Sequence, residues 1–208
     1  MHVLLTDQMT CPRCGPTFGL VLLAHEVRER RVLEGELGCP NCRDHFPVRA
    51  GFADLRAPPR TALPTDTSPP APPEPAATLR LAALLGIVEG PGAAVLIGDA
   101  VSHAAGLARS VPGIEWVAVN PACALESERS GVTRIAARPG LPFYQRRLRG
   151  AVVDARIGDS WIVEAARVVA PLGRVVVLHT NERTSDLLRR EGLSLLAVEA
   201  ETVVAARG

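Results

Sequence analysis

The chain of 208 residues contains no lysine, so all 23 of its basic residues are arginines, set against 22 acidic residues. A net charge of +1 argues against a protein that depends on a broad basic field to hold nucleic acid. Aromatic residues are scarce as well: two Trp, one Tyr and four Phe leave little material for a base-stacking platform. Charge therefore does not indicate RNA as a direct partner.

Long apolar runs are also missing. None reaches the ~18–20 residues that a membrane span needs, because Gly, Glu or Pro interrupts the longest ones. The first residues lack the basic segment and apolar stretch of a secretory signal. We therefore expect a soluble, cytoplasmic protein with no membrane partner.

One segment divides the chain. Residues 57–77 hold eight of the 18 prolines and show no hydrophobic periodicity. Since proline removes a backbone donor and disfavours helix at the preceding residue, this segment is predicted to be a semi-extended linker. It separates a small unit, residues 1–56, from a larger one, residues 78–208.

The small unit contains two C-P-x-C motifs, whose cysteines are Cys11, Cys14, Cys39 and Cys42. In a reducing compartment such pairs are typical of metal ligands, and two of them provide the four thiolates of a tetrahedral zinc ion. A catalytic zinc keeps one position open, so a full set of cysteines predicts a structural site. A unit of this size usually needs such a staple.

Other residues could alter that assignment. His25 and His45 lie near enough in sequence to compete as ligands, whereas Cys123 is expected to be a small buried residue. The charged segment 26–31 is compatible with a short helix or with a twisted hairpin.

The larger unit alternates apolar strands with helices, which predicts an α/β, Rossmann-like, mostly parallel sheet that ends in an antiparallel hairpin. Thr78 and Ser102 are expected to cap helices. The expected strands are residues 93–97, 116–119, 132–136, 151–153, 174–178, 195–198 and 202–205, and the expected helices are 78–85, 102–111, 160–169 and 185–190.

The residues from Cys39 to Leu55, CPNCRDHFPVRAGFADL, resemble the zinc-ribbon proteins that act as activating partners of methyltransferases. The resemblance implies an interaction domain that stabilises a class I methyltransferase acting on RNA or a translation factor. It implies no catalysis by the ribbon itself. The ribbon could dock on its own larger unit or on another chain.

The larger unit is similar to class I S-adenosylmethionine-dependent methyltransferases. The segment WIVEAARVVAPLGRVVVL, Trp161 to Leu178, looks like the stretch leading into the fifth strand of that family, and Leu141-Pro142-Phe143 resembles its Leu-Pro-Phe before the fourth. The resemblance implies a cofactor site at Gly98 and Asp99, after the first strand, and at Asn120, after the second.

That cofactor site departs from the family pattern. Only Gly98 remains of a glycine-rich turn, and Asn120 stands where a carboxylate would bind the ribose hydroxyls. No catalytic residue can be named, although Asp99 and His103 flank the loop, and Asp154 and Asp159 follow the fourth strand. The arginines of the segment 146–149 suit either a phosphate contact or a solvated loop.

Two functions follow from these observations. The first is a degenerate methyltransferase-like protein, a pseudoenzyme with a fused structural zinc ribbon, which serves as scaffold or regulatory partner in methylation of RNA or translation factors. Its partner would be a methyltransferase or a protein of the translation machinery. The alternative is an active S-adenosylmethionine-dependent methyltransferase.

Overall fold

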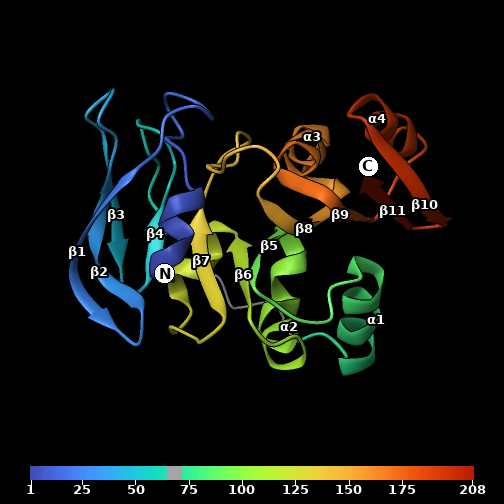
Figure 1. Ribbon diagram of the computed structural model, residues 1–208, viewed down its shortest axis with the longest axis horizontal. Helices are drawn as coiled ribbons and strands as arrows, with labels where there is room; N and C mark the ends of the chain where they lie inside the picture. The colour runs from blue at the N-terminus through green and yellow to red at the C-terminus, as the bar shows by residue number, and fades with distance from the viewer. Residues whose placement is uncertain (65–71) are drawn as a thin grey trace.

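A computed structural model describes residues 1–64 and 72–208, and through them runs a single mixed sheet of eleven strands (Figure 1). The strand order is β1-β2-β3-β4-β7-β6-β5-β8-β9-β11-β10. The strands are β1 (Val21–Arg28), β2 (Arg31–Gly38), β3 (His45–Arg49), β4 (Phe52–Asp54), β5 (Gly92–Ile97), β6 (Ile114–Val119), β7 (Val132–Ala136), β8 (Leu148–Asp154), β9 (Val169–Leu178), β10 (Leu193–Glu199) and β11 (Thr202–Arg207).

Short helices connect and cover these strands. Those of the α type are α1 (Pro75–Leu85), α2 (Ala104–Ser110), α3 (Asp159–Val168) and α4 (Thr184–Arg190). The 3-10 helices are η1 (Val3–Gln8), η2 (Gly98–His103), η3 (Pro121–Leu125) and η4 (Ala155–Ile157). Within the described residues no helix has the length and apolar character needed to cross a membrane.

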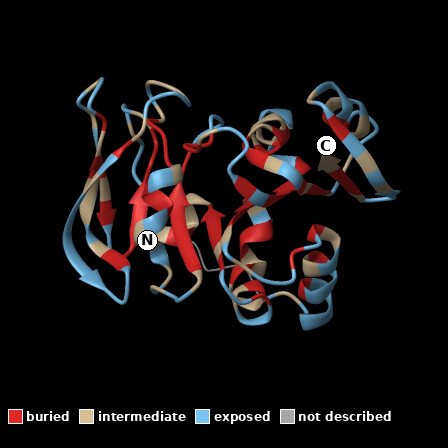
Figure 2. Cartoon of the chain, viewed as in Figure 1, coloured by how far each residue is buried: buried red, intermediate tan, exposed pale blue. Residues whose placement is uncertain are grey.

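The sheet confirms the predicted α/β class. Strands β7, β6, β5, β8 and β9 are parallel, β11 is antiparallel to β9, and β10 and β11 form the expected terminal hairpin. The central strands are buried on both faces because their sequences, such as Ala93–Ile97, are apolar throughout (Figure 2). The chain runs outward from β5 to β7 and then returns to β8, so the strand order reverses between β5 and β8.

The expected caps at Thr78 and Ser102 were wrong. Helix α1 begins at Pro75, and the buried hydroxyl of Thr78 lies 2.9 Å from Nδ1 of His103. Ser102 lies inside η2 and donates its hydroxyl hydrogen to the carbonyl oxygen of Asp99 over 2.8 Å. Helix α1 starts at a proline, whose fixed φ suits the first helical position. The helix expected to start at Ser102 instead begins after the 3-10 helix η2.

The segment 26–31 forms the hairpin rather than the helix. Strands β1 and β2 are antiparallel, and the two residues of their turn, Glu29 and Arg30, have φ of 48° and 63°. Two positive φ values in a two-residue loop match the twist of the flanking strands.

The small unit extends the larger one directly. Strand β4 pairs in parallel with β7, so that Phe52, Ala53 and Asp54 lie opposite residues 134–136. A single hydrophobic core continues from the small unit, where it includes Phe46, into the central strands. Of the two docking arrangements left open by the sequence, the structure therefore has the one in which the small unit packs on its own chain.

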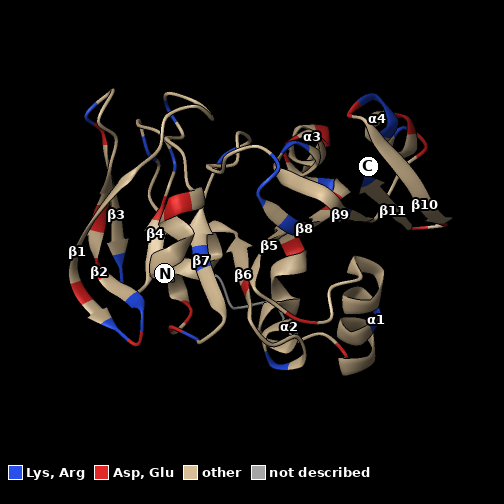
Figure 3. Cartoon of the chain, in the orientation of Figure 1, with Lys and Arg blue, Asp and Glu red and all other residues tan. Residues whose placement is uncertain are grey.

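Two crossovers of the larger unit carry no α-helix. The β6–β7 connection contains only η3, and the β7–β8 connection, residues 137–147, contains no helix. Helix η1 of the small unit lies in front of β4 and β7 in Figure 1, and its residue Leu5 and the following Met9 belong to the core of that face. Acidic and basic residues are interspersed over most elements (Figure 3).

Candidate functional site

The four cysteines of the two C-P-x-C motifs come together, as predicted. Their sulfur atoms all lie within 4.8 Å of one another, with Cys11 Sγ 3.7 Å from Cys42 Sγ and Cys14 Sγ 3.8 Å from Cys39 Sγ. A tetrahedron with Zn–S bonds of about 2.3 Å has edges of about 3.8 Å. The spacing of the thiols thus matches a tetrahedral metal ion of that size.

Hydrogen bonds orient these sulfur atoms. Cys11 Sγ accepts the backbone N–H of Cys14 over 3.4 Å, and Cys14 Sγ accepts the side-chain amide of Asn41 over 3.3 Å. Burial raises the pKa of the Cys11 thiol to about 12. Burial also acts to raise the pKa of Cys39, but backbone N–H groups of Cys42 and Asn41 bring it down to about 7. Such a donor set, all sulfur and without an open position, fits a structural ion.

The competing ligands lie elsewhere. The ring of His45 is exposed, with Nδ1 3.2 Å from Oε1 of Glu36, and His25 is exposed on β1. Neither belongs to the cysteine group. Cys123 is buried as expected, and burial raises the pKa of its thiol to about 12.

The cysteine-bearing loops are joined by hydrogen bonds to the crossover between β7 and β8. The carbonyl oxygen of Pro142 accepts the N–H of Thr10 over 2.9 Å, and Tyr144 donates its N–H to the carbonyl of Gln8 over 3.0 Å. From the other side, Arg167 of α3 donates to the carbonyls of Leu141 and Phe143. The Leu-Pro-Phe segment thus connects the ribbon to the larger unit.

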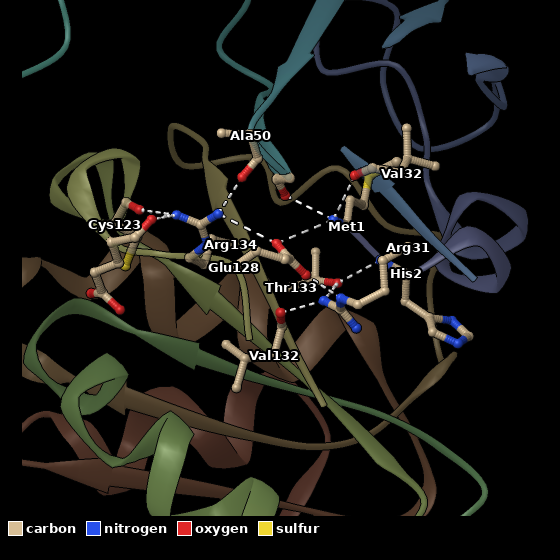
Figure 4. Close-up of polar contacts among 12 residues, drawn as sticks. Met1, His2, Arg31, Val32, Ala50, Cys123, Glu128, Val132, Thr133 and Arg134 are labelled. Atoms are coloured by element: carbon tan, nitrogen blue, oxygen red, sulfur yellow. Dashed lines mark hydrogen bonds and ion pairs between the residues drawn. The ribbon is translucent and has the colours of Figure 1, made fainter. Parts of the chain in front are cut away.

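A buried charge network forms a second connection (Figure 4). Arg31 of β2 and Arg134 of β7 converge on the carboxylate of Glu128, and Arg31 also contacts Glu115 of β6 over 3.0 Å. The two arginines are 7% and 1% exposed. The Met1 amine, whose pKa burial lowers to about 5, donates to the carbonyls of residues 32 and 51.

Thr133 completes this network. Its hydroxyl donates to Glu115 over 2.6 Å and accepts the backbone N–H of His2 over 3.0 Å. Arg134 also donates to three backbone carbonyls, those of Ala50, Cys123 and Glu126. Both terminal nitrogens of Arg134 are thus paired, whereas its buried Nε has no hydrogen-bond partner in the described part of the chain.

The residues predicted to bind the cofactor meet at one edge of the sheet. Because Ile97 pairs with Val119 and Val153, the residues that follow, Gly98, Asn120 and Asp154, lie at neighbouring strand ends. This edge carries the carboxyl ends of the parallel strands at the point where the strand order reverses. Open α/β sheets bind their ligands there.

Two side chains lie close to Gly98, which itself stays partly exposed. Gly98 has a φ of +73°, and a methyl group built on it would lie 3.3 Å from two carbons of Ile157 and 3.1 Å from Cβ of Asp154. Arg156 reaches across the edge, with Nη2 2.7 Å from Asp99 and 2.5 Å from Asp154.

The carboxylate of Asp154 is the centre of this group. This carboxylate is 2% exposed, and its Oδ1 also lies 3.3 Å from Nδ1 of His179. The backbone of His179 has a φ of +53°. Burial would raise the pKa of Asp154, but hydrogen bonds from Arg156 lower it below its usual value. The result is a charged cluster at the position where a cofactor would enter.

Two of the three residues predicted to bind the cofactor are engaged within the chain. Asp99 pairs with Arg156, and Oδ1 of Asn120 accepts the N–H of Ala122 over 2.9 Å to cap η3. Two cavities of about 730 and 720 Å³ lie elsewhere, and neither is lined by Gly98, Asp99 or Asn120. The assignment of these three residues to a cofactor stays a prediction.

Sequence reasoning missed a repeated local motif. Asp54-Leu55-Arg56 ends β4 and Asp154-Ala155-Arg156 ends β8, and in both the aspartate accepts the backbone N–H and the guanidinium of the arginine two residues later. An Asp-x-Arg sequence directly after an apolar strand is the signal that could have revealed these two motifs.

The remaining candidate residues lie at other places. Asp159 begins α3. The arginines at 146 and 147 are exposed, and their backbone N–H groups donate to the carbonyls of Arg167 and Val168.

Comparisons with known proteins identify the fold of this chain but no family. No family model and no curated protein matches the chain. Among solved structures, it is similar to a geranyl diphosphate methyltransferase in complex with S-adenosylmethionine (12% identity, 65% of this chain and 86% of that one, TM-score 0.51). It is also similar to a Methanococcus maripaludis protein classed as an S-adenosylmethionine-dependent methyltransferase (11% identity, 64% of this chain and 84% of that one, TM-score 0.50).

A third similar structure is a Galdieria sulphuraria protein classed as a sarcosine dimethylglycine methyltransferase (14% identity, 59% of this chain, TM-score 0.47). The chain spans only 62% of that protein and 38% of a Haemonchus contortus phosphoethanolamine N-methyltransferase. At these identities the likeness concerns architecture alone. The larger unit thus has the Rossmann-like fold of S-adenosylmethionine-dependent methyltransferases, joined to a small unit with a four-cysteine cluster.

Proposed function

We propose that the chain is a methyltransferase-like scaffold with a closed cofactor crevice, stabilised by its own zinc ribbon of the activator type. The observation that carries this proposal is that Ile157 lies against Gly98 and that Arg156 pairs with Asp99 and Asp154 beside it, where the cofactor of an active enzyme would need open backbone. The scaffold would act as a regulatory partner in methylation of RNA or a translation factor. This role comes from the resemblance of Cys39 to Leu55 to the activating ribbons.

The ribbon's part in this proposal is structural. With zinc bound, Cys11, Cys14, Cys39 and Cys42 would hold two loops against each other, and the ion would supply folding energy without taking part in a reaction. The ribbon then presents β4 to the edge of β7 and η1 to the adjacent face. These are the contacts by which it would stabilise a methyltransferase-like sheet.

The proposed partner must use another surface. Strand β4 already covers the edge of β7, so the ribbon has its docking strand engaged within the chain. A separate methyltransferase or a protein of the translation machinery would therefore contact the assembled molecule rather than replace the larger unit at the ribbon.

The alternative, an active S-adenosylmethionine-dependent methyltransferase, is favoured by one feature. Gly98 keeps the positive φ of +73° at the start of the loop after β5, a conformation suited to close approach of a ligand. For this alternative, Arg156 and Ile157 would have to leave the crevice.

Calorimetry with S-adenosylmethionine separates the two functions. Full-length, zinc-loaded protein is titrated, and the scaffold predicts no heat of binding at millimolar ligand. Micromolar binding would retire the scaffold and support the enzyme. Metal analysis tests the ribbon separately, because the proposal requires about one zinc per chain from its four cysteine ligands.

A further inference from the structure

A cavity of about 720 Å³ lies beside α1, α2 and the connection between β6 and β7. Helices α1 and α2 are neighbours at the lower end of the molecule in Figure 1. The volume falls in the range of about 300–1,000 Å³ that is usual for small-molecule sites. The cavity is separate from the predicted cofactor residues, since Gly98, Asp99 and Asn120 do not line it.

Positive charge gathers on the described walls of this cavity. Arg109, in the last turn of α2, and Arg129, in the β6–β7 connection, are both exposed, and the ion pairs of the described residues include neither of them. A third lining arginine, Arg134, is already paired with Glu128. Against these charges the described walls offer one carboxylate, Glu126. The end of α2 adds at most about half a negative charge, so an excess of positive charge remains.

Serine hydroxyls accompany the two unpaired arginines. Ser110 directly follows Arg109, and Ser127 comes two residues before Arg129. Both serines line the cavity and are exposed. Guanidinium and hydroxyl groups are donors that suit the oxygen atoms of a phosphate or a carboxylate.

Apolar side chains line the same cavity and stay open to solvent. Leu79 of α1 is 58% exposed and Leu125 of η3 is 48% exposed. The rings of Pro72 and Pro73 add further apolar surface. A hydrocarbon group laid against these residues removes apolar surface from water on both sides of the contact, which is favourable.

We propose that this cavity binds an amphipathic anion, whose phosphate or carboxylate head pairs with Arg109 and Arg129 and whose hydrocarbon body covers Leu79 and Leu125. A nucleic-acid strand fits less well, because the described walls contain no aromatic side chain on which a base would stack. This site goes beyond the proposed function and does not rest on it.

The test is calorimetric titration of zinc-loaded full-length protein with octyl phosphate. Inorganic phosphate carries the head alone and octanol the tail alone, and each is expected to bind at least about tenfold more weakly, because it gives up one half of the contacts. Octanoate has the same tail length with a carboxylate head. The tighter of octyl phosphate and octanoate identifies the head group that the site prefers.

Variants of exposed residues locate the site. The double variant Arg109→Gln/Arg129→Gln is expected to lower the association constant of octyl phosphate at least about fivefold, and Leu125→Ala to lower it about two- to fivefold. Arg147→Gln and Leu196→Ala are the matched controls, since both residues are exposed and neither lines the cavity. Both controls should bind like the wild type.

These outcomes leave the proposal open to refutation. If octyl phosphate does not bind, or binds no better than octanol, the anion site is overturned. An equal loss in Arg147→Gln would also overturn it, by assigning the binding to surface charge in general. Because every substituted residue is exposed, all variants should unfold within a few degrees of the wild type. Titration with S-adenosylmethionine decides the proposed function separately, so that the two proposals fail independently.

Discussion

Replacing Leu5 by alanine tests whether the ribbon and the larger unit are one folding unit. Leu5 is 2% exposed on η1 and belongs to the core that includes the central strands, whereas its neighbour Leu4 is 51% exposed. Removing a buried leucine costs about 2–5 kcal/mol, and we expect the lower half of that range because Leu5 also borders a cavity. The exposed Leu4→Ala is expected to cost no more than about 0.5 kcal/mol.

The assay is thermal unfolding followed by circular dichroism and calorimetry. In a chain of this length each kcal/mol lowers Tm by about 2–4 °C, so Leu5→Ala is expected to lower Tm by roughly 4–14 °C. The whole chain should unfold in one transition, since a continuous sheet and core cross the boundary between the two units. Equal Tm values for the two variants, or a separate transition of the larger unit that Leu5→Ala leaves unmoved, would refute the reasoning.

Three further predictions concern single residues. Cys39→Ser is expected to lower bound metal well below one ion per chain, while Cys123→Ser leaves the metal content unchanged; elemental analysis of the purified variants decides this. Arg134→Ala is expected to destabilise the chain by about 3–5 kcal/mol in urea unfolding, since it strips buried carbonyls and Glu128 of their partner, and a loss under 1 kcal/mol would contradict the network. Burial would raise the pKa of Asp54, but Arg56 lowers it, so its folded-state pKa lies below the unfolded one. The resulting stability is present at neutral pH and lost as pH falls through about 4 and below, and a plot of Tm against pH should be flatter there for Asp54→Asn.

The strands of the larger unit and the cysteine cluster could be predicted because their signals are local. Runs such as Ala93–Ile97 are apolar throughout, which is typical of a strand buried on both faces. The paired C-P-x-C motifs specify their own chemistry, and the structure brings their sulfur atoms together. Local composition was enough in both cases.

The docking of the ribbon could not be predicted, because it depends on pairing between distant segments. Strand β4 has three residues and meets β7 some 80 positions later. Arg31 and Arg134 gave no signal either, since arginine is normally exposed and only the assembled interface supplies the acceptors that allow its burial. The pairing of Asp99 with Arg156 likewise depends on η4, whose Asp-x-Arg sequence was not recognised as a structural motif.

The β7–β8 connection contains no helix, and the ribbon packs beside β7 on its own chain. These two features together yield a last prediction. Without the ribbon, β7 would be an open edge strand, and the core that Leu5 of η1 shares with the central strands would lose the residues of the small unit, while residues 137–147 contain no helix to replace them. Exposed edges and apolar faces lead to aggregation. The fragment 72–208 expressed alone is therefore expected to be insoluble or oligomeric in gel filtration, and co-expression with the fragment 1–64 to restore a soluble one-to-one complex. A monomeric, folded fragment 72–208 would show that the ribbon is an accessory to the larger unit and not a part of its fold.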